Sequence, residues 1–153
     1  MLEWIQPVTD RSQSDVSRLL TLLKKGWDDF TTDERTEWTA GMKGALNRSD
    51  MQRIQNNIQL LSDVLELGLV IKAVPDHPNE TFLSSIITNT EIIRNAYVIH
   101  TDTPETPSMP VNTYQKLNDI EKILEDVYGI LLNNFHYYCG TEVYAGDETG
   151  MIL

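Results

Sequence analysis

Two long stretches of the sequence repeat apolar residues at steps of three and four, which restricts them to amphipathic helices that need a shared core. The first stretch runs from Met51 to Leu65 and the second from Leu117 to Leu131. A helix with one apolar face must bury that face against another element. The sequence therefore predicts a mainly α protein built as a helical bundle.

Cap signatures place the ends of about five helices. Ser, Thr or Asn accepts hydrogen bonds from the first free backbone N–H groups of a helix, and an acidic residue three positions later closes the box. These signals predict helices over about 12–25, 33–41, 47–68, 79–99 and 112–134. The expected capping residues are Ser12 with Asp15, Thr31 with Glu34, Asn47 or Ser49, Asn79, and Asn112.

The two ends of the chain differ from the helical body. Residues 1–11 hold apolar side chains around Pro7, which predicts an extended N-terminal arm. Residues 135–153 place aromatic and β-branched residues on both sides of a Gly-flanked turn, which favours a small C-terminal β-hairpin. We expect three parts: an arm and helical lobe over 1–100, a Pro-rich linker or surface strap over 101–111, and a long helix with the hairpin over 112–153.

The two long apolar stripes align with each other at a fixed offset. Ile54, Ile58 and Leu61 correspond to Ile120, Leu124 and Val127. An internal duplication would produce this match, and so would two unrelated amphipathic helices. Both interpretations stay open at the level of sequence.

Composition excludes several classes of partner and environment. Twelve basic residues against 23 acidic ones give a net charge of −11, which disfavours a nucleic-acid partner. No stretch approaches the length of apolar sequence that a membrane span needs. A lone cysteine, Cys139, cannot form an intramolecular disulfide. We expect synthesis in the cytoplasm and no membrane partner.

Catalytic, metal and cofactor sites find little support in the sequence. His77, His100 and His136 lack the helical spacing that would place two ligands on one face. No glycine-rich loop of the phosphate-binding kind occurs, and the acidic pairs fall in polar surface stretches. We predict no catalytic residue, no metal and no cofactor. A small hydrolase using Cys139 and His136 is the remaining enzymatic alternative.

Aromatic and apolar side chains at the two ends of the chain are the candidates for an interface, because aromatic anchors are common at the centres of protein interfaces. Trp27, Phe30 and Trp38 are expected to meet in a core instead. The interface candidates are Trp4, Ile5, Tyr137, Tyr138, Val143, Tyr144, Met151 and Ile152.

Several runs of the sequence resemble structural proteins of phages and prophages of Gram-positive bacteria. The first half contains TDRSQSDVSRLL and KGWDDFTTDERTEWTAGMKGALNRSDMQRIQNNIQLLSDVL, which are similar to a helical module of tail and baseplate proteins. The second half contains VNTYQKLNDIEKILEDVY and NNFHYYCGTEVYAGDETGMIL, which are similar to minor structural and fibre-base segments. Such modules often precede a long fibre or receptor-binding region, which this sequence does not contain.

The resemblance implies a virion protein that spaces or attaches tail, baseplate or fibre subunits, in several symmetric copies and without catalysis. It carries over no catalytic residue. An alternative from another class is an acidic intracellular regulator or assembly chaperone that binds a basic partner, which the charge of −11 favours.

Overall fold

The computed structural model describes residues 2–139, and the side chains among them up to Asn134. In this part the chain forms five α-helices and one short 3₁₀ helix, and no strand. The mainly helical class is therefore confirmed, while the predicted C-terminal hairpin lies beyond the described residues. The elements are α1 (Gln13–Lys25), η1 (Trp27–Asp29), α2 (Thr32–Ala40), α3 (Arg48–Val64), α4 (Glu80–Ala96) and α5 (Tyr114–Cys139).

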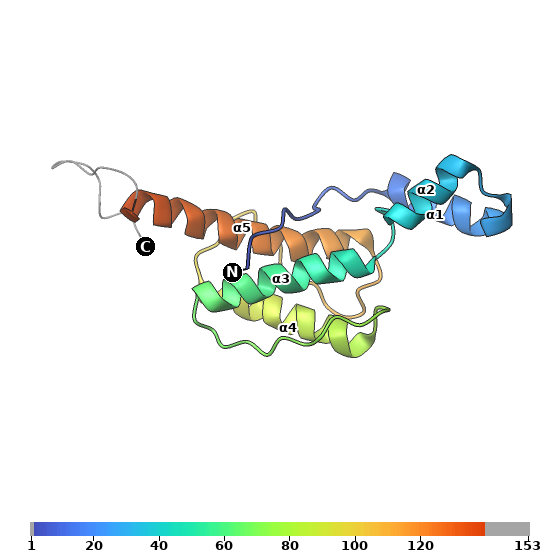
Figure 1. Cartoon of the computed structure of the whole chain (residues 1–153). Coiled ribbons are helices and arrows are strands. Elements are labelled where there is room, and N and C mark those ends of the chain that lie inside the picture. The colour runs from blue at the N-terminus through green and yellow to red at the C-terminus, as the bar shows by residue number, and fades with distance from the viewer. Residues whose placement is uncertain (1, 140–153) are drawn as a thin grey trace.

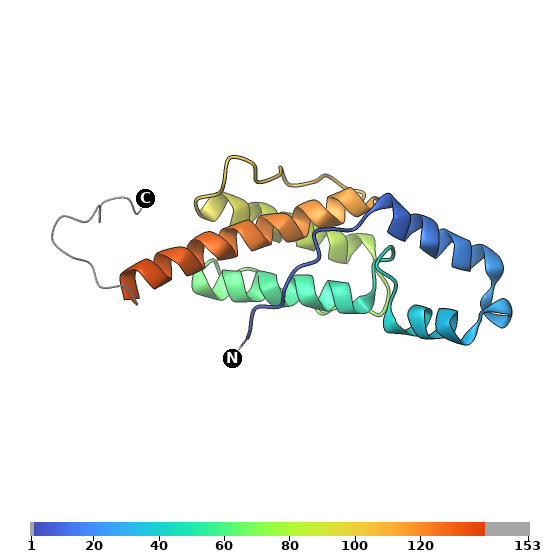
Figure 2. The ribbon, with the colours of Figure 1, turned by 90° about the horizontal axis from the view of Figure 1, so that it is seen from above.

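The molecule is elongated, with two packed parts (Figures 1 and 2). Helices α3, α4 and α5 form a three-helix bundle. Helices α1 and α2 form a separate helical lobe, residues 12–46, which extends from one end of the bundle. The C-terminal end of α5 projects at the opposite end.

Each part has its own core. The bundle core contains the buried residues of the two sequence stripes together with three from α4: Met51, Ile54, Ile58, Leu61, Phe82, Ile86, Ile93, Ile120, Leu124 and Val127. The lobe core contains only Leu22, Phe30 and Met42 as buried apolar residues. The bundle core thus spans both sides of the expected boundary at 101–111, and the separate packing unit lies within the first 46 residues instead.

Four predicted N-caps are found in the structure. Ser12, Thr31 and Asn47 each form a capping box with the acidic residue three positions later, and Asn79 accepts a hydrogen bond from the N–H of Phe82 at 2.8 Å. These side chains replace the backbone partners that the first turn of a helix lacks.

Three helix boundaries differ from the prediction: the end of α3 and both ends of α5. Helix α3 ends at Val64 rather than near Gly68, because Glu66 and Gly68 adopt positive φ angles of 54° and 60° that stop the helix. Helix α5 continues through the expected end at Asn133 and Asn134 to Cys139. Thr113, not Asn112, accepts a hydrogen bond from the first turn of α5.

The Pro-rich segment lies against the bundle as a strap. The guanidinium of Arg94 donates to the carbonyl of Pro104 at 2.9 Å, and the Thr103 hydroxyl donates to the buried carboxylate of Asp126 at 2.7 Å. The ammonium of Lys116 donates to two further strap carbonyls.

Among the described helices, none is both long and apolar enough to cross a lipid bilayer.

Candidate interaction surface

The N-terminal arm, residues 2–11, lies along α3 and α5 (Figure 2) and is held there by asparagine side chains. The N–H of Ile5 donates to Asn57 Oδ1 at 3.0 Å, and Asn57 Nδ2 donates back to the carbonyl of Ile5 at 2.7 Å. Asn118 makes the same reciprocal pair with Arg11, at 3.2 and 2.9 Å. Each amide replaces the partner that a neighbouring strand would give an extended backbone.

A buried network of four charged side chains fixes the point where the arm enters the lobe. The guanidinium of Arg11 contacts Asp50 at 3.2 Å and Glu121 at 2.8 Å, and Arg53 contacts the same two carboxylates at 2.6 and 2.7 Å. The N–H of Val8 donates to the second oxygen of Glu121 at 2.9 Å. Two positive and two negative groups compensate each other, which a buried charge requires.

Within this network, the pKa of Arg53 is shifted. Burial by itself would lower the pKa of Arg53, but the hydrogen bonds that its guanidinium donates to Glu121 and Asp50 raise that pKa above its usual value. Arg53 therefore stays charged and keeps both carboxylates paired. The network joins the arm, α3 and α5 into one unit.

At the end of the arm away from the lobe, the Trp4 ring stacks on α5. Its ring lies parallel to that of Tyr128, with centroids 4.0 Å apart and an angle of 4° between the planes. Beside this pair, the C-terminal end of α3 and residues 128–132 of α5 enclose an almost wholly apolar groove of about 240 Å³. We call it the bundle-end groove; its lining residues are Leu60, Leu61, Val64, Tyr128, Leu131 and Leu132.

The bundle-end groove is open to solvent along two of its side chains. Val64 is 59% exposed and Leu132 is 51% exposed. On the arm, Ile5 is 46% exposed while Trp4 is only partly accessible. An apolar groove with exposed large side chains is typical of a protein interaction site.

The structure places the predicted interface residues unevenly. Trp4 and Ile5 lie on the arm, which contacts α3 and α5 of its own chain. Tyr137 and Tyr138 lie within the last turns of α5, and the structure describes only their backbone. Four predicted candidates lie outside the described residues, so their role as interface residues stays a prediction: Val143, Tyr144, Met151 and Ile152.

Sequence reasoning missed the groove residues and the exposure of one tryptophan. Val64 was expected to belong to a buried stripe, and nothing distinguished Leu132 from its neighbours. Trp27, Phe30 and Trp38 do meet, with ring centroids 5.5 and 5.6 Å apart. Trp27 is nevertheless 48% exposed, contrary to the expectation of a core position. The sequence does contain one sign that apolar side chains of this lobe are exposed. The number of leucines in 19–23 exceeds what one helix face can bury.

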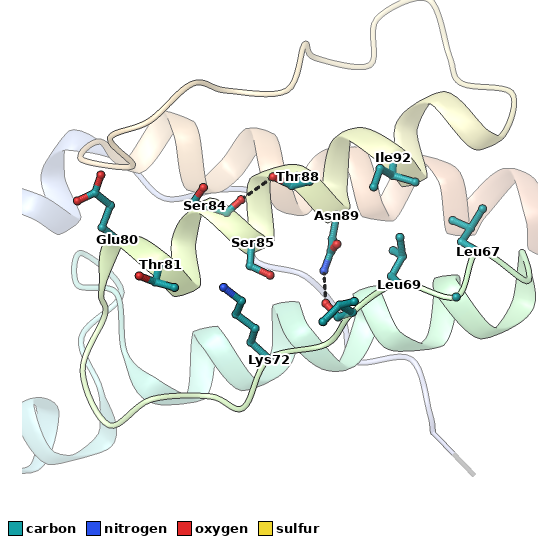
Figure 3. Close-up of a pocket in the computed structure, with 12 residues that line it drawn as sticks. Leu67, Leu69, Lys72, Glu80, Thr81, Ser84, Ser85, Thr88, Asn89 and Ile92 are labelled. Carbon is teal, nitrogen blue, oxygen red and sulfur yellow. Dashed lines mark hydrogen bonds between the residues drawn. The ribbon is translucent and has the colours of Figure 1, made fainter.

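A second, wider groove of about 780 Å³ lies between the extended segment 67–72 and α4 (Figure 3). Asn89 Nδ2 donates to the carbonyl of Val70 at 3.1 Å and so holds this segment on the helix. Lys72 and Glu80 are the charged residues of its lining, and serine and threonine hydroxyls supply much of the rest. The lining contains no histidine or cysteine, and the Thr88 hydroxyl already donates to the carbonyl of Ser84.

Asp119 on α5 provides a pH-dependent test of the bundle. Burial raises the pKa of Asp119, which means that the folded protein binds its proton more tightly than the unfolded chain does. The ionised carboxylate therefore destabilises the fold once the pH exceeds the unfolded pKa. Asp119→Asn should raise the free energy of unfolding at pH 7 by less than about 0.5 kcal/mol. Urea titrations at pH 7 and pH 3 check this, because the gain should disappear at pH 3, where Asp119 is protonated in both states.

No group of three or more histidine, cysteine, aspartate or glutamate side chains in the described part of the chain is arranged to hold a metal ion. Comparisons with protein-family models, with curated protein sequences and with solved structures gave no match to this chain.

Proposed function

We propose that this chain is a structural adaptor protein of a tailed-phage virion, in the tail, baseplate or fibre-attachment region, and that it acts without catalysis. The observation that supports an adaptor role is the bundle-end groove, where an apolar surface with Val64 and Leu132 more than half exposed lies beside the stacked pair of Trp4 and Tyr128. The virion setting comes from the sequence resemblance alone.

In this proposal the chain is made in the host cytoplasm and incorporated into the particle through contacts with other virion subunits and with its own copies. The buried charge network keeps the arm in one position on the bundle, so Trp4 is presented in a fixed place. A rigid anchor loses little conformational entropy when a partner binds. A scaffold that positions other proteins benefits from this property.

Particle composition tests the proposal. Mass spectrometry of gradient-purified particles, from a strain that carries this sequence, should detect the chain at a fixed ratio to a major tail protein. Deletion of its gene should give particles that lack tail or baseplate components. Absence of the chain from intact particles would contradict the virion role.

The acidic regulator or chaperone is the second candidate, and the net charge of −11 favours it. Pull-down from infected cells at low and high salt separates the two candidates. A complex with a basic partner should dissociate as salt screens the charges, whereas a complex that buries the bundle-end groove should persist.

A further inference from the structure

The chain between α3 and α4 runs along the outside of the bundle (Figure 1) and contains a strand-like segment, residues 67–74. Its sequence, LGLVIKAV, is rich in the apolar and β-branched residues that favour strands. Exposure alternates along it as in a strand. The half-buried side chains are Leu67, Leu69 and Ile71, and the exposed residues between them are Gly68, Val70 and Lys72. The described residues nevertheless provide no strand to pair with it.

Side chains of the bundle bind the carbonyls on one edge of this segment. Asn89 Nδ2 on α4 donates to the carbonyl of Val70 at 3.1 Å (Figure 3), and Gln55 Nε2 on α3 donates to the carbonyl of Lys72 at 2.6 Å. In an extended chain, every second residue directs its N–H and C=O to the same side. The edge formed by Val70 and Lys72 is therefore the one that the two helices hold.

Leu69, Ile71 and Ala73 present their backbone groups on the other edge, which we call the free edge. The N–H of Leu69 donates to the Ser62 hydroxyl at 3.1 Å. The remaining groups of these three residues, which are three carbonyls and two N–H groups, form no hydrogen bond with the described part of the chain. Backbone groups without a protein partner are almost always in contact with water, so the free edge is open to a partner.

The free edge is complementary to itself. When two copies of the segment run antiparallel about a twofold axis at Ile71, the N–H of each Ile71 meets the carbonyl of the other. Two residues along, the N–H of Ala73 in one copy meets the carbonyl of Leu69 in the other, and the axis repeats this bond. Each of these bonds uses a group that is unpaired in the single chain. The N–H of Leu69, which Ser62 already binds, is not needed.

The side chains of the two segments are compatible with this register. Val70 of one copy lies opposite Lys72 of the other, and such cross-strand pairs stabilise a ladder. Val70 is 76% exposed in the single chain. The methylene groups of Lys72 can cover it while the ammonium stays in water. The two Lys72 side chains are not directly opposite each other.

We propose that two copies of the chain pair through their free edges, with residues 69–73 of each forming an antiparallel ladder about a twofold axis at Ile71. A second copy fits because it supplies the same unpaired groups in the same positions, and a twofold contact closes as a dimer. The ladder is short, so the dimer is weak and depends on concentration. This inference goes beyond the proposed function, which assigns no surface to contacts between copies.

Amide hydrogen exchange of the wild-type chain, followed by NMR at increasing protein concentration, tests the ladder residue by residue. The N–H groups of Ile71 and Ala73 should exchange more slowly at high concentration, by about tenfold or more, because the partner copy protects them. The N–H groups of Val70 and Lys72 lie on the opposite edge and should keep their exchange rates. Sedimentation velocity should show a dimer over the same range of concentration.

Ala73→Pro removes a ladder donor at an exposed residue whose N–H has no partner among the described residues. Proline fits an extended backbone, so circular dichroism should show an unchanged fold. The twofold axis doubles the change, and dimerisation should weaken by about tenfold or more. Lys72→Pro and Lys72→Ala are the matched controls. They remove the same side chain and differ in an N–H on the opposite edge, so they should dimerise equally.

Several results would overturn the paired edges. A chain that stays monomeric up to its solubility limit would show that Lys72 protects the edge from pairing. Undiminished dimerisation of Ala73→Pro would place the contact elsewhere. Protection of Ile71 and Ala73 at every concentration would identify a segment of the same chain as the partner. The virion role is tested separately: a monomer found in particles overturns only the dimer, and a dimer absent from particles overturns only the virion role.

Discussion

Arg11→Met should lower the free energy of unfolding by about 3–5 kcal/mol, because it removes one partner from a buried charge network and leaves a net negative charge inside the protein. The side chain of Arg11 is 1% exposed and so is that of Glu121, 2.8 Å away. Arg53 alone would then face both Asp50 and Glu121. Urea unfolding followed by circular dichroism measures the change, with an unchanged dependence on urea as evidence that only stability has shifted.

The exposed ion pair between Arg18 and Glu37 is the control for Arg11. Its distance is 2.9 Å, similar to that of Arg11 and Glu121, but its side chains are 44% and 40% exposed. Arg18→Met should therefore change the free energy of unfolding by about 1 kcal/mol or less. Equal losses for the two variants would show that burial of the network has no energetic importance.

A double variant separates loss of the pair from loss of packing. Arg11→Met with Glu121→Gln removes one positive and one negative charge and leaves Arg53 paired with Asp50 at 2.6 Å. The double variant should lose less stability than the sum of the two single variants, because neither remaining charge lacks a partner. Additive losses would contradict the coupling of Arg11 to Glu121.

The helices follow from local signals, which is why they could be predicted. Ser12, Thr31, Asn47 and Asn79 cap helices through neighbours within three residues, so the sequence around each is sufficient. The apolar stripe of α3 likewise shows its buried face without knowledge of its partners. The end of α3 was less predictable because Glu66, a residue with a side chain, adopts a left-handed conformation there.

The position of the arm depends on contacts that no local pattern contains. Asn57 binds a backbone 52 residues away, and Asn118 binds one 107 residues away. An asparagine on a helix flank has the same sequence signature whether it faces solvent or a distant backbone. An arginine in an extended arm is ordinarily a surface residue, so the burial of Arg11 could not be anticipated.

The candidate surfaces were only partly predictable, because they too depend on contacts between residues far apart in the sequence. Trp4 and Ile5 stood out because an apolar arm needs a partner, but the sequence did not identify α3 and α5 as that partner. The exposure of Leu20 and Leu23 on α1, 48% and 55%, was hidden because both resemble core residues of an amphipathic helix. Their exposure reflects the small size of the lobe, whose core has room for only a few side chains.

Gly44→Ala should destabilise the lobe by about 1–3 kcal/mol, since a Cβ atom there would meet the backbone of another element. The added carbon would lie 2.5 Å from the carbonyl carbon of Asp15 and 2.8 Å from the nitrogen of Val16. Both atoms belong to the first turn of α1, which cannot move as a flexible side chain can. The segment before α3 would have to separate from α1.

Gly129→Ala is the matched substitution with the opposite expected sign. Gly129 lies within α5, and a Cβ atom there would have no neighbour within 4 Å. Alanine should stabilise α5 by up to about 1 kcal/mol because it favours helix more than glycine does. Both substitutions reduce the freedom of the unfolded chain in the same way, so the difference between them isolates the close contact at Gly44.

Two optical signals locate the effect of Gly44→Ala. Trp27 and Trp38 lie in the lobe, and the third tryptophan, Trp4, which lies on the bundle, is replaced by phenylalanine in every protein compared, so that fluorescence reports on the lobe. Helix content comes mainly from the longer helices of the bundle. If the substitution loosens only the lobe, the fluorescence transition should move to lower urea while the main circular dichroism transition stays in place. A shared shift of both signals would show instead that the lobe and the bundle unfold together, through the junction where Arg11 and Asp50 meet. Unchanged stability in both signals would contradict the close packing of residue 44 on α1.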